Sequence, residues 1–329
     1  MKTHETPDNI TPDRTLVPPS GSQYEIRSGD QTVVLTEVGA ALRTYTVKGR
    51  SVLDDYAEDE HCTGARGQSL IPWPNRISRG HYGWRGSSRQ LDLTEPDKHG
   101  AIHGLTRWAN WTVTDHGPAR VSFTYVLHAC PGWPSVLRCR LDYSLDEYGL
   151  TVRTSGTNVG TTACPYGTGA HPYLSVGTPI IDGASAQAPG SVYLPVDELG
   201  IPTGWKPVDG THYDLRTEEE LGAREIDVAY TDLHRGADGR ARVRLVAPDR
   251  AAGVELWVDE SYPYLEIFTG DTLPEPGRRR TGLGVEPMTC APNAFNSGEG
   301  LITLEPGESH TASWGINPYP ELWKSATRH

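Results

Sequence analysis

One acidic residue and two histidines stand out in this 329-residue chain because of their surroundings. Glu286 lies in a mostly apolar run over residues 284–288, just before a proline, while His103 and His171 lie far upstream in short segments flanked by Gly or Pro. A carboxylate and two imidazoles delivered from distant loops suit proton transfer on a neutral substrate. A carboxylate among apolar neighbours is either paired with Arg or Lys or has a raised pKa, so Glu286 is the leading candidate for a functional group.

A second candidate site is segment 71–77, which has the sequence Ile-Pro-Trp-Pro-Asn-Arg-Ile. Its prolines make the loop rigid, so that Trp73 could stack on the C–H groups of a sugar ring and the fork of Arg76 could bind vicinal oxygens. The same residues also fit a packed loop in which Arg76 pairs with a surface carboxylate. The segment alone does not decide between the two interpretations.

Each of the other candidates has a structural interpretation when it is taken alone. His103 and His171 could be hydrogen-bonded structural histidines, and Asp227, in a short amphipathic segment, could be a solvated acid. The histidines show no H-x-x-H or H-E-x-x-H spacing, so we expect no metal ion. No Gly-rich phosphate loop is present either, and we expect no cofactor.

Strand patterns dominate the elements that must position these groups. Residues 140–153 alternate apolar and polar side chains around a turn at 146–149, which predicts a hairpin with one buried face. The alternation recurs at 121–125, 242–245, 254–258 and 265–269, and at 301–316 around a turn at 305–308. Only residues 217–221 predict a short helix. With 36 Gly and 26 Pro between the runs, the pattern predicts an all-β fold, a large antiparallel β-sandwich with very little helix.

Composition limits the organisation and the partners. Residues 1–20 are rich in Pro, Thr and Asp and predict a flexible tail, while residues 21–329 predict a single domain. The net charge of −12, without a basic stripe, argues against a nucleic acid or a membrane surface as partner. Five cysteines without a C-x-x-C pair, and the lack of a signal-peptide core, predict a cytoplasmic protein. We expect a monomer or a homodimer.

Six short motifs, in this order, resemble those of the aldose 1-epimerase (galactose mutarotase) family. They are Pro-Asn-Arg-Ile at 74–77, Ile-His-Gly at 102–104, Gly-Ala-His-Pro-Tyr at 169–173, Ile-Asp-Val-Ala-Tyr at 226–230, Val-Glu-Pro-Met at 285–288 and Leu-Glu-Pro-Gly-Glu at 304–308. Each motif is weak alone, but all six in the family order make a specific signal that covers about residues 25–318.

The resemblance implies a large β-sandwich with a monosaccharide bound in a cleft on one sheet. It also implies roles for the catalytic candidates: Glu286 as general base at the C1 hydroxyl, His171 as general acid at the ring oxygen, and His103 as its assistant or as a hydroxyl ligand. The residues that would bind the sugar are Arg76, Asn75, Asp227, Trp73 and Tyr173. A base and an acid on opposite sides of the C1–O5 bond would open and close the ring without a cofactor.

Departures from the family pattern leave the sugar open. Segment 170–174 is Ala-His-Pro-Tyr-Leu where galactose-specific members often have Asn-His-x-Tyr-Phe, and Tyr230 stands where Phe is common. The Trp-rich loop 105–111 is similar to a bacterial branch in which some members handle sulfoquinovose, and Arg107 or Arg66 could bind a sulfonate. The pattern also leaves open a hexose 6-phosphate mutarotase, a carbohydrate-binding protein without turnover and, more distantly, a uronic acid lyase.

Overall fold

A hairpin of alternating buried and solvent-facing residues lies within the largest sheet. The computed structural model describes residues 16–319, and in it β12 (Leu137–Leu145) and β13 (Leu150–Asn158) bury every second side chain. The turn between them is closed by the N–H of Asp146, which donates to the carbonyl of Gly149 at 3.0 Å. This is the hairpin that the sequence predicts over residues 140–153.

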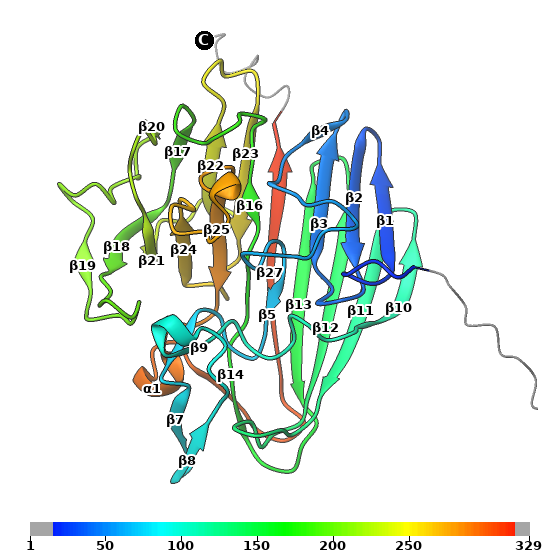
Figure 1. Cartoon of the computed structure of the whole chain (residues 1–329), viewed down its shortest axis with the longest axis vertical. Coiled ribbons are helices and arrows are strands. Elements are labelled where there is room, and N and C mark those ends of the chain that lie inside the picture. The colour runs from blue at the N-terminus through cyan, green and yellow to red at the C-terminus, as the bar shows by residue number, and fades with distance from the viewer. Residues whose placement is uncertain (1–15, 320–329) are drawn as a thin grey trace, which may run out of the picture.

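The hairpin belongs to a nine-stranded antiparallel sheet within the described residues (Figure 1). In spatial order its strands are β10 (Thr112–Gly117), β11 (Arg120–Leu127), β12, β13, β27 (Ser309–Pro318), β23 (Gly253–Val258), β22 (Ala241–Val246), β17 (Ser185–Gln187) and β20 (Glu219–Glu220). The predicted strands at 121–125, 242–245, 254–258 and 301–316 are all confirmed, the last as β26 (Ile302–Leu304) and β27 around the 305–308 turn.

A second large sheet, eight-stranded over residues 16–319, carries most of the candidate site. Its order is β19 (Lys206–Pro207), β18 (Gly190–Leu194), β21 (Asp227–Leu233), β24 (Tyr264–Phe268), β25 (Leu283–Met288), β15 (Gly169–Ala170) and β5 (Ser69–Leu70), with β16 (Tyr173–Leu174) also paired to β25. All six residues of β25 are buried, which places this strand in the interior of the protein with neighbours on both faces.

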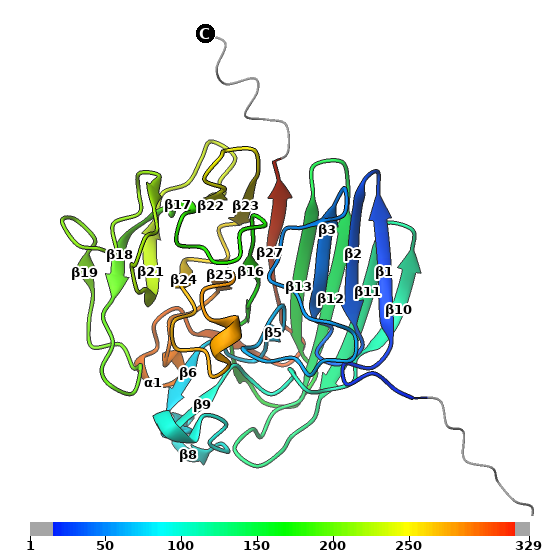
Figure 2. The same ribbon diagram turned by 45° about the horizontal axis from the view of Figure 1, so that its top comes forward.

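Smaller sheets complete the architecture (Figure 2). One is the four-stranded sheet β1 (Gln23–Ser28), β2 (Gln31–Thr36), β3 (Leu42–Val47) and β4 (Arg50–Ser51); the pairs are β6 (Arg76–Ser78) with β9 (Gly100–Ile102), β7 (His81–Trp84) with β8 (Ser87–Gln90), and β14 (Cys164–Tyr166) with β26. The helical turns in the described part of the chain are η1 (Pro96–Lys98), η2 (Pro276–Arg278) and α1 (Ala294–Ser297). The all-β prediction with very little helix is therefore confirmed.

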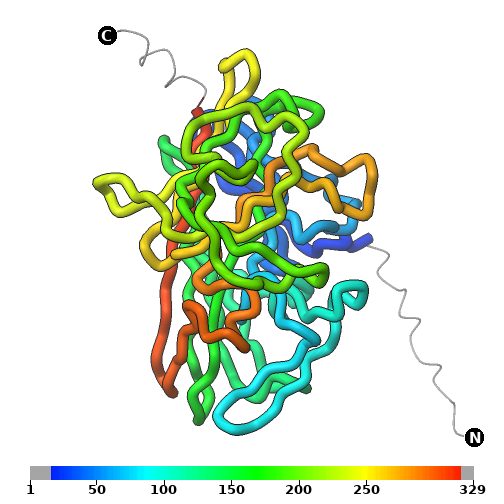
Figure 3. Tube along the Cα trace, turned by 90° about the vertical axis from the view of Figure 1, so that its left-hand side faces the viewer, coloured from blue at the N-terminus to red at the C-terminus, as the bar shows by residue number. Residues whose placement is uncertain are grey.

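One apolar core draws on both large sheets. Its members run from Ile26 to Ile316 and include Leu141 and Leu256 of the nine-stranded sheet and Ile267 and Val285 of the eight-stranded one. The two large sheets therefore pack on a common core. Figure 3 shows the loops around residues 95–105 (cyan) and 271–283 (orange) on the side away from β27 (red).

The helix predicted at 217–221 is wrong, because Glu219 and Glu220 form β20, which pairs with β17 at a sheet edge. A single turn is too short to nucleate a helix, so backbone pairing with the sheet decides its conformation. The predicted tail lies mostly outside the described residues, but Ser20 is buried and its carbonyl accepts the N–H of Val38. Among residues 16–319, no helix is long and apolar enough to span a bilayer.

Candidate active site

Strand register gathers three acidic residues on one face of the eight-stranded sheet. Glu266 of β24 lies directly opposite Glu286 of β25, and Asp227 of β21 lies opposite Phe268, two residues along from Glu266. Because alternate residues of a strand point to the same face, Asp227, Glu266 and Glu286 share a face. Their neighbours in sequence, such as Ile267 and Val285, point the other way into the core.

His171 joins this row across a break in the adjoining strand. Gly169 pairs with Met288 and Tyr173 pairs with Gly284, so the same register puts His171 opposite Glu286. Pro172, which follows His171, has no N–H to give to a ladder, and β15 and β16 are separate short strands on either side of it. The backbone of His171 is held instead by Gly67 and Gln68, through hydrogen bonds of 3.0 and 3.1 Å.

Glu286 and His171 are in direct contact. The Nε2 of His171 lies 3.0 Å from Oε1 of Glu286, and the two residues are 5% and 3% exposed respectively. From the sequence we expected Glu286 either to pair with Arg or Lys or to have a raised pKa; the group that it contacts is a histidine. The two groups also lie side by side on one sheet rather than on opposite sides of a gap. Nδ1 of His171 and Oε2 of Glu286 are buried without a hydrogen-bond partner among the described residues.

His103 completes the group from a different part of the chain. It follows β9, whose pairing with β6 brings residues 100–102 beside 76–78. Its ring meets that of His171 edge to face, with centroids 5.2 Å apart. The next residue must be Gly104: its φ is +72°, and a Cβ there would lie 2.1 Å from the carbonyl oxygen of Ile71. Gly104 in the Ile-His-Gly motif thus allows the backbone to pass close to Ile71, and this close approach fixes the position of the His103 side chain.

The hydrogen bonds of His103 define its tautomer. The backbone N–H of Asn75 donates to Nδ1 at 3.2 Å, so a neutral ring carries its proton on Nε2. Burial, together with His171, Arg107 and Arg76, lowers the pKa of His103 well below its usual 6.5. His103 is therefore a neutral imidazole that can donate one hydrogen bond from Nε2. Of the two histidines of the site, it is not the one that carries an extra proton.

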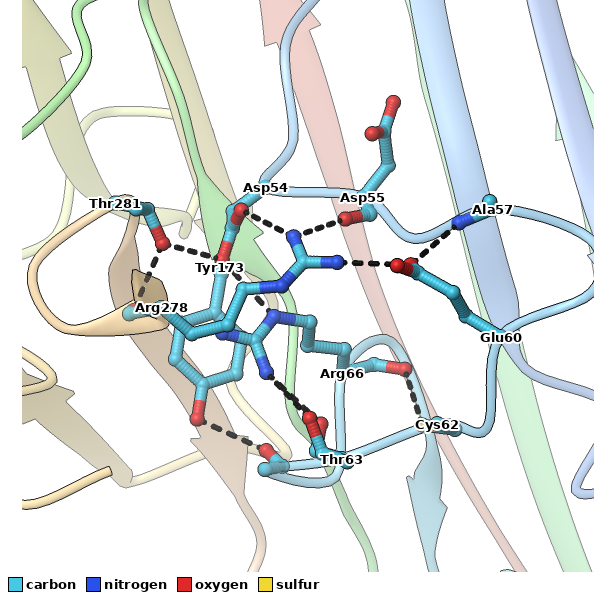
Figure 4. Close-up of polar contacts among 11 residues, drawn as sticks. Asp54, Asp55, Ala57, Glu60, Cys62, Thr63, Arg66, Tyr173, Arg278 and Thr281 are labelled. Atoms are coloured by element: carbon cyan, nitrogen blue, oxygen red, sulfur yellow. Dashed lines mark hydrogen bonds and ion pairs between the residues drawn. The ribbon is translucent and has the colours of Figure 1, made fainter. Parts of the chain in front are cut away.

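Tyr173 packs against the ring of His171. Its ring stacks on the imidazole with centroids 4.8 Å apart, and its hydroxyl donates to the carbonyl of Gly64 at 2.8 Å. The guanidinium of Arg66 lies 4.9 Å from the Tyr173 ring centre and is held by Asp54 at 2.9 Å (Figure 4). Burial, and then Glu286, raise the pKa of Tyr173 well above its usual value, so the phenol is neutral. Tyr173 therefore contacts the His171 ring directly, and Arg66 contacts Tyr173.

The same network ties down the loop that follows η2. Asp54 also accepts from the hydroxyl of Thr281 at 2.9 Å, and Arg278 reaches the Asp55 carbonyl and Glu60 (Figure 4). Nε and Nη1 of Arg66 donate hydrogen bonds to Asp54 and Thr63, while Nη2 is buried without a partner among the described residues. Binding of an anionic group by Arg66 stays a prediction, and Nη2 is the atom that could make it.

Arg76 and Asn75 lie beside the carboxylates but are engaged with the protein. Arg76 forms a two-pronged ion pair with Glu95, with distances of 2.6 and 2.9 Å. Asn75 accepts from the N–H of Arg76 through Oδ1 and donates from Nδ2 to Glu266 at 3.3 Å. Pairing of Arg76 with a carboxylate was one of the two interpretations that the sequence left open, and it commits Nε and Nη2 of this guanidinium to the protein framework.

The remaining predicted sugar ligands fall into different environments. Asp227 is exposed and lines a cavity of about 290 Å³ together with Tyr213, Phe268 and Asp271. Trp73 is buried in the core with its ring against Phe295 at 5.6 Å. A ring packed in this way has no open face for a sugar, so its position does not fit the stacking role that the sequence suggested.

Sequence reasoning missed two residues of the site. The alternation at 265–269 indicates only that Glu266 is a polar position of a strand, and none of the six motifs includes Glu95, which pairs with Arg76. Glu266 is 3% exposed, and burial with neighbouring Asp227 and Glu286 raises its pKa well above the usual value. A glutamate in a strand that is buried on both faces is unusual, and this is the sequence signal that could have identified Glu266.

Two other features of the site bear on ligands. Ligand atoms of His103, His171 and Glu286 all lie within 4.8 Å of one another, a donor set that could also hold a divalent cation. Nearby, the Arg107 guanidinium makes long hydrogen bonds, 3.4 Å to Gln68 and 3.5 Å to the Ile102 carbonyl, and lies 5.6 Å from the centre of the Trp108 ring. It has no carboxylate partner among the described residues. Burial lowers the pKa of Arg107, and Glu286 is among the charges that oppose this.

A larger hollow elsewhere is a weaker candidate. It has a volume of about 760 Å³ and shares no residue with the group around Glu286. Its arginines are engaged: Arg216 pairs with Asp214, Arg242 with Asp238, and Arg235 donates to backbone carbonyls. The buried carboxylate–histidine group is therefore the stronger candidate for an active site.

Comparison with known proteins identifies the family. The family model of aldose 1-epimerases matches residues 22–317. The chain belongs to the aldose 1-epimerase family. It is 33% identical over 298 residues to the uncharacterized protein YihR of Escherichia coli (strain K12), covering 90% of this chain and 93% of that one. It is 30% identical over 228 residues to the galactose mutarotase of Rattus norvegicus, covering 62% of this chain and 64% of that one.

Solved structures show the same fold. A GalM/aldose epimerase homologue from C. elegans superposes with a TM-score of 0.81 over 91% of this chain and 98% of its own, at 17% sequence identity. At that identity the likeness concerns the fold alone. The family membership places this aldose epimerase-type protein among enzymes that act on sugars, and the resemblance noted from the six motifs is confirmed.

Proposed function

We propose that this family member interconverts the α and β anomers of a hexose by general acid–base catalysis. The observation that supports this best is the 3.0 Å contact between the carboxylate of Glu286 and the imidazole of His171, both buried. O1 and O5 of a pyranose are bonded to the same carbon, C1. A base and an acid that touch each other can therefore serve both oxygens of one sugar.

In the competent state Glu286 is ionised and His171 is protonated. Glu286 takes the proton of the C1 hydroxyl while His171 gives a proton to the ring oxygen, and the C1–O5 bond breaks to give the open-chain aldehyde. Rotation about C1–C2 followed by the reverse transfers closes the ring as either anomer. Each positioned group contributes on the order of 10²–10⁴-fold, and protons are returned at the end of each cycle.

The surrounding residues orient the sugar and the acid. His103 donates from Nε2 to an oxygen near His171, and Tyr173 fixes the plane of the His171 ring through its stack. Asp227, which remains open to solvent, accepts from hydroxyls at the far end of the ring. These assignments agree with the name of the rat relative, galactose mutarotase, but the departures in segment 170–174 keep galactose as one candidate sugar among several.

The experiment is a saturation-transfer NMR panel of anomer exchange with galactose, glucose, xylose and arabinose, comparing wild type with Glu286→Gln. We expect faster exchange for at least one sugar with the wild type and a loss of at least about 10²-fold in kcat for the variant. Glu147→Gln, in an exposed turn, is the control and should retain full activity. Sugar binding without any acceleration would instead support a carbohydrate-binding protein without turnover.

An anionic sugar is the second candidate, and Arg107 is the observation that favours it. This guanidinium lies near Glu286 and His103, has a buried Nε without a partner, and has no carboxylate within ion-pair distance in residues 16–319. A sulfonate or phosphate would satisfy it. Adding sulfoquinovose and glucose 6-phosphate to the panel tests this, and Arg107→Gln should then raise KM for the anionic sugar while leaving neutral sugars unaffected.

A further inference from the structure

Glu266 and Glu286 are the same residue type, are equally buried at 3% exposure, and lie directly opposite each other on neighbouring strands. Side chains in such a pair have Cβ atoms about 5 Å apart, and like charges placed there repel. Ionising two buried carboxyl groups this close together is costly, so one of them is expected to keep its proton. The proposed mechanism uses Glu286 and leaves Glu266 without a role.

The partners of the two carboxyl groups show which one carries the charge. Glu286 contacts the imidazole of His171, which can carry a positive charge, at 3.0 Å. Glu266 receives its one hydrogen bond in the described structure from the neutral amide of Asn75, at 3.3 Å. The orientation of that amide is fixed, because its oxygen accepts the N–H of Arg76 at 2.8 Å and its NH₂ must therefore face Glu266.

The charged groups around Glu266 favour its neutral form. Asp227 faces it from β21 and Glu286 from β25, while Arg76 on β6 is the cation on the third side. Arg76 is already committed to Glu95 through two hydrogen bonds of 2.6 and 2.9 Å. Burial and the two carboxylates raise the pKa of Glu266 well above its usual value, and Arg76 only partly opposes this.

We propose that Glu266 keeps its proton at neutral pH and presents a carboxylic O–H as a hydrogen-bond donor to a hydroxyl oxygen of the sugar, so that Glu286 is the ionised member of the pair. One oxygen of Glu266 is taken by the Asn75 amide, so the other carries the proton. The part concerning the sugar rests on the proposed function. The part concerning the proton does not, and it can be tested on the free protein.

Infrared difference spectroscopy tests the protonation state. At pH 7 we expect a C=O stretch of a protonated carboxylic acid in the wild type that disappears in Glu266→Gln. Glu255→Gln is the matched control: Glu255 is also 3% exposed but is paired with Arg242 at 3.2 Å and Arg244 at 2.9 Å, so its loss should leave the band in place. The absence of the band in wild type, or its persistence in Glu266→Gln, would overturn the proposal.

Kinetics test the donor. Gln is neutral and retains donor hydrogens, so Glu266→Gln should lose less kcat/KM than Glu266→Met and leave the acid limb of the pH profile in place. If Glu266 were ionised, removing its charge would move that limb down by about one pH unit or more. Glu266→Met, which cannot donate, should raise KM about tenfold with little change in kcat.

Two outcomes distinguish a failure of the donor role of Glu266 from a failure of the proposed function. Equal kinetic losses in Glu266→Gln and Glu266→Met would mean that Glu266 has only a structural role, and would overturn the donor assignment. A wild-type protein that accelerates no anomer exchange would instead overturn the proposed function, while the infrared result would still decide which glutamate holds the proton.

Discussion

The rings of Tyr173 and His171 stack with their planes 19° apart, and this contact sets the orientation of the imidazole that faces Glu286. Tyr173 is in turn fixed by the Gly64 carbonyl and lies under the Arg66 guanidinium. The acid of the proposed reaction is thus held by Tyr173 of β16, which segment 64–66 fixes in turn. We propose that Tyr173, which the resemblance implies is a sugar ligand, positions His171.

Tyr173→Phe tests that positioning. The variant keeps the stack but loses the hydrogen bond to Gly64, so we expect kcat to fall about fivefold, the equivalent of about 1 kcal/mol, with KM nearly unchanged. Tyr148→Phe, at an exposed turn, is the control. A rise in KM with unchanged kcat would show that the hydroxyl of Tyr173 binds the sugar instead.

The pH dependence of kcat/KM should be bell-shaped. A mechanism that needs an ionised base and a protonated acid loses activity at both ends of the pH range. A flat profile between about pH 5 and 8 would contradict this assignment.

His103 should not contribute to either limb of that profile. Its pKa is lowered well below 6.5, so it stays neutral over the working range. His103→Gln, which retains a donor, should therefore reduce activity without moving either limb. A limb that shifts in this variant would show that His103 titrates during catalysis.

Folding stability should carry the signature of Glu266. Its pKa is raised in the folded state above the usual value of 4.5, so its contribution to stability is complete at low pH and is lost as the pH rises above about 4.5. The wild type should lose about 1.4 kcal/mol per pH unit relative to Glu266→Gln while Glu266 stays protonated in the fold. Urea unfolding at pH 5, 6 and 7 measures this, and a constant difference would contradict it.

Gly104→Ala should damage both the fold and the site. The φ of +72° and the 2.1 Å approach to the Ile71 carbonyl leave no room for a Cβ, so we expect a loss of at least about 2 kcal/mol in unfolding free energy and lower activity through displacement of His103. Gly277→Ala, where a Cβ would meet nothing within 4 Å, is the control and should be neutral in the same unfolding experiment. An unaffected Gly104→Ala would show that the loop relaxes freely.

Zinc should inhibit the enzyme, and a chelator should not. The ligand atoms of His103, His171 and Glu286 lie within 4.8 Å of one another, so Zn²⁺ would occupy the groups that transfer protons. Proton transfer by Glu286 and His171 needs only those side chains, so treatment with EDTA should leave the exchange rate unchanged. A loss of activity in EDTA that is restored by one divalent metal would contradict the proposed mechanism.

The sequence by itself determined the strands and the candidates for chemistry. Period-two alternation is a local property, so the hairpin at β12–β13 and strands β22 to β24 could be predicted directly from the pattern. Glu286, His103 and His171 could be singled out because a charged or titratable group among apolar, Gly or Pro neighbours is costly unless it is used or paired. The helix predicted at 217–221 failed because a single turn has too little local preference to resist pairing with β17.

Only the tertiary structure decided which of these residues meet. The register between β25 and the broken strand β15–β16 sets His171 against Glu286, and the register between β24 and β25 sets Glu266 beside the same carboxylate. Residues 20 and 115 positions apart in the chain cannot be paired from local patterns, because strand register depends on packing over the whole sheet. The same packing buries Trp73 against Phe295 and stacks Tyr173 on His171. The sequence specifies which residues are aromatic, but the packing of the sheet decides which face of each ring is covered.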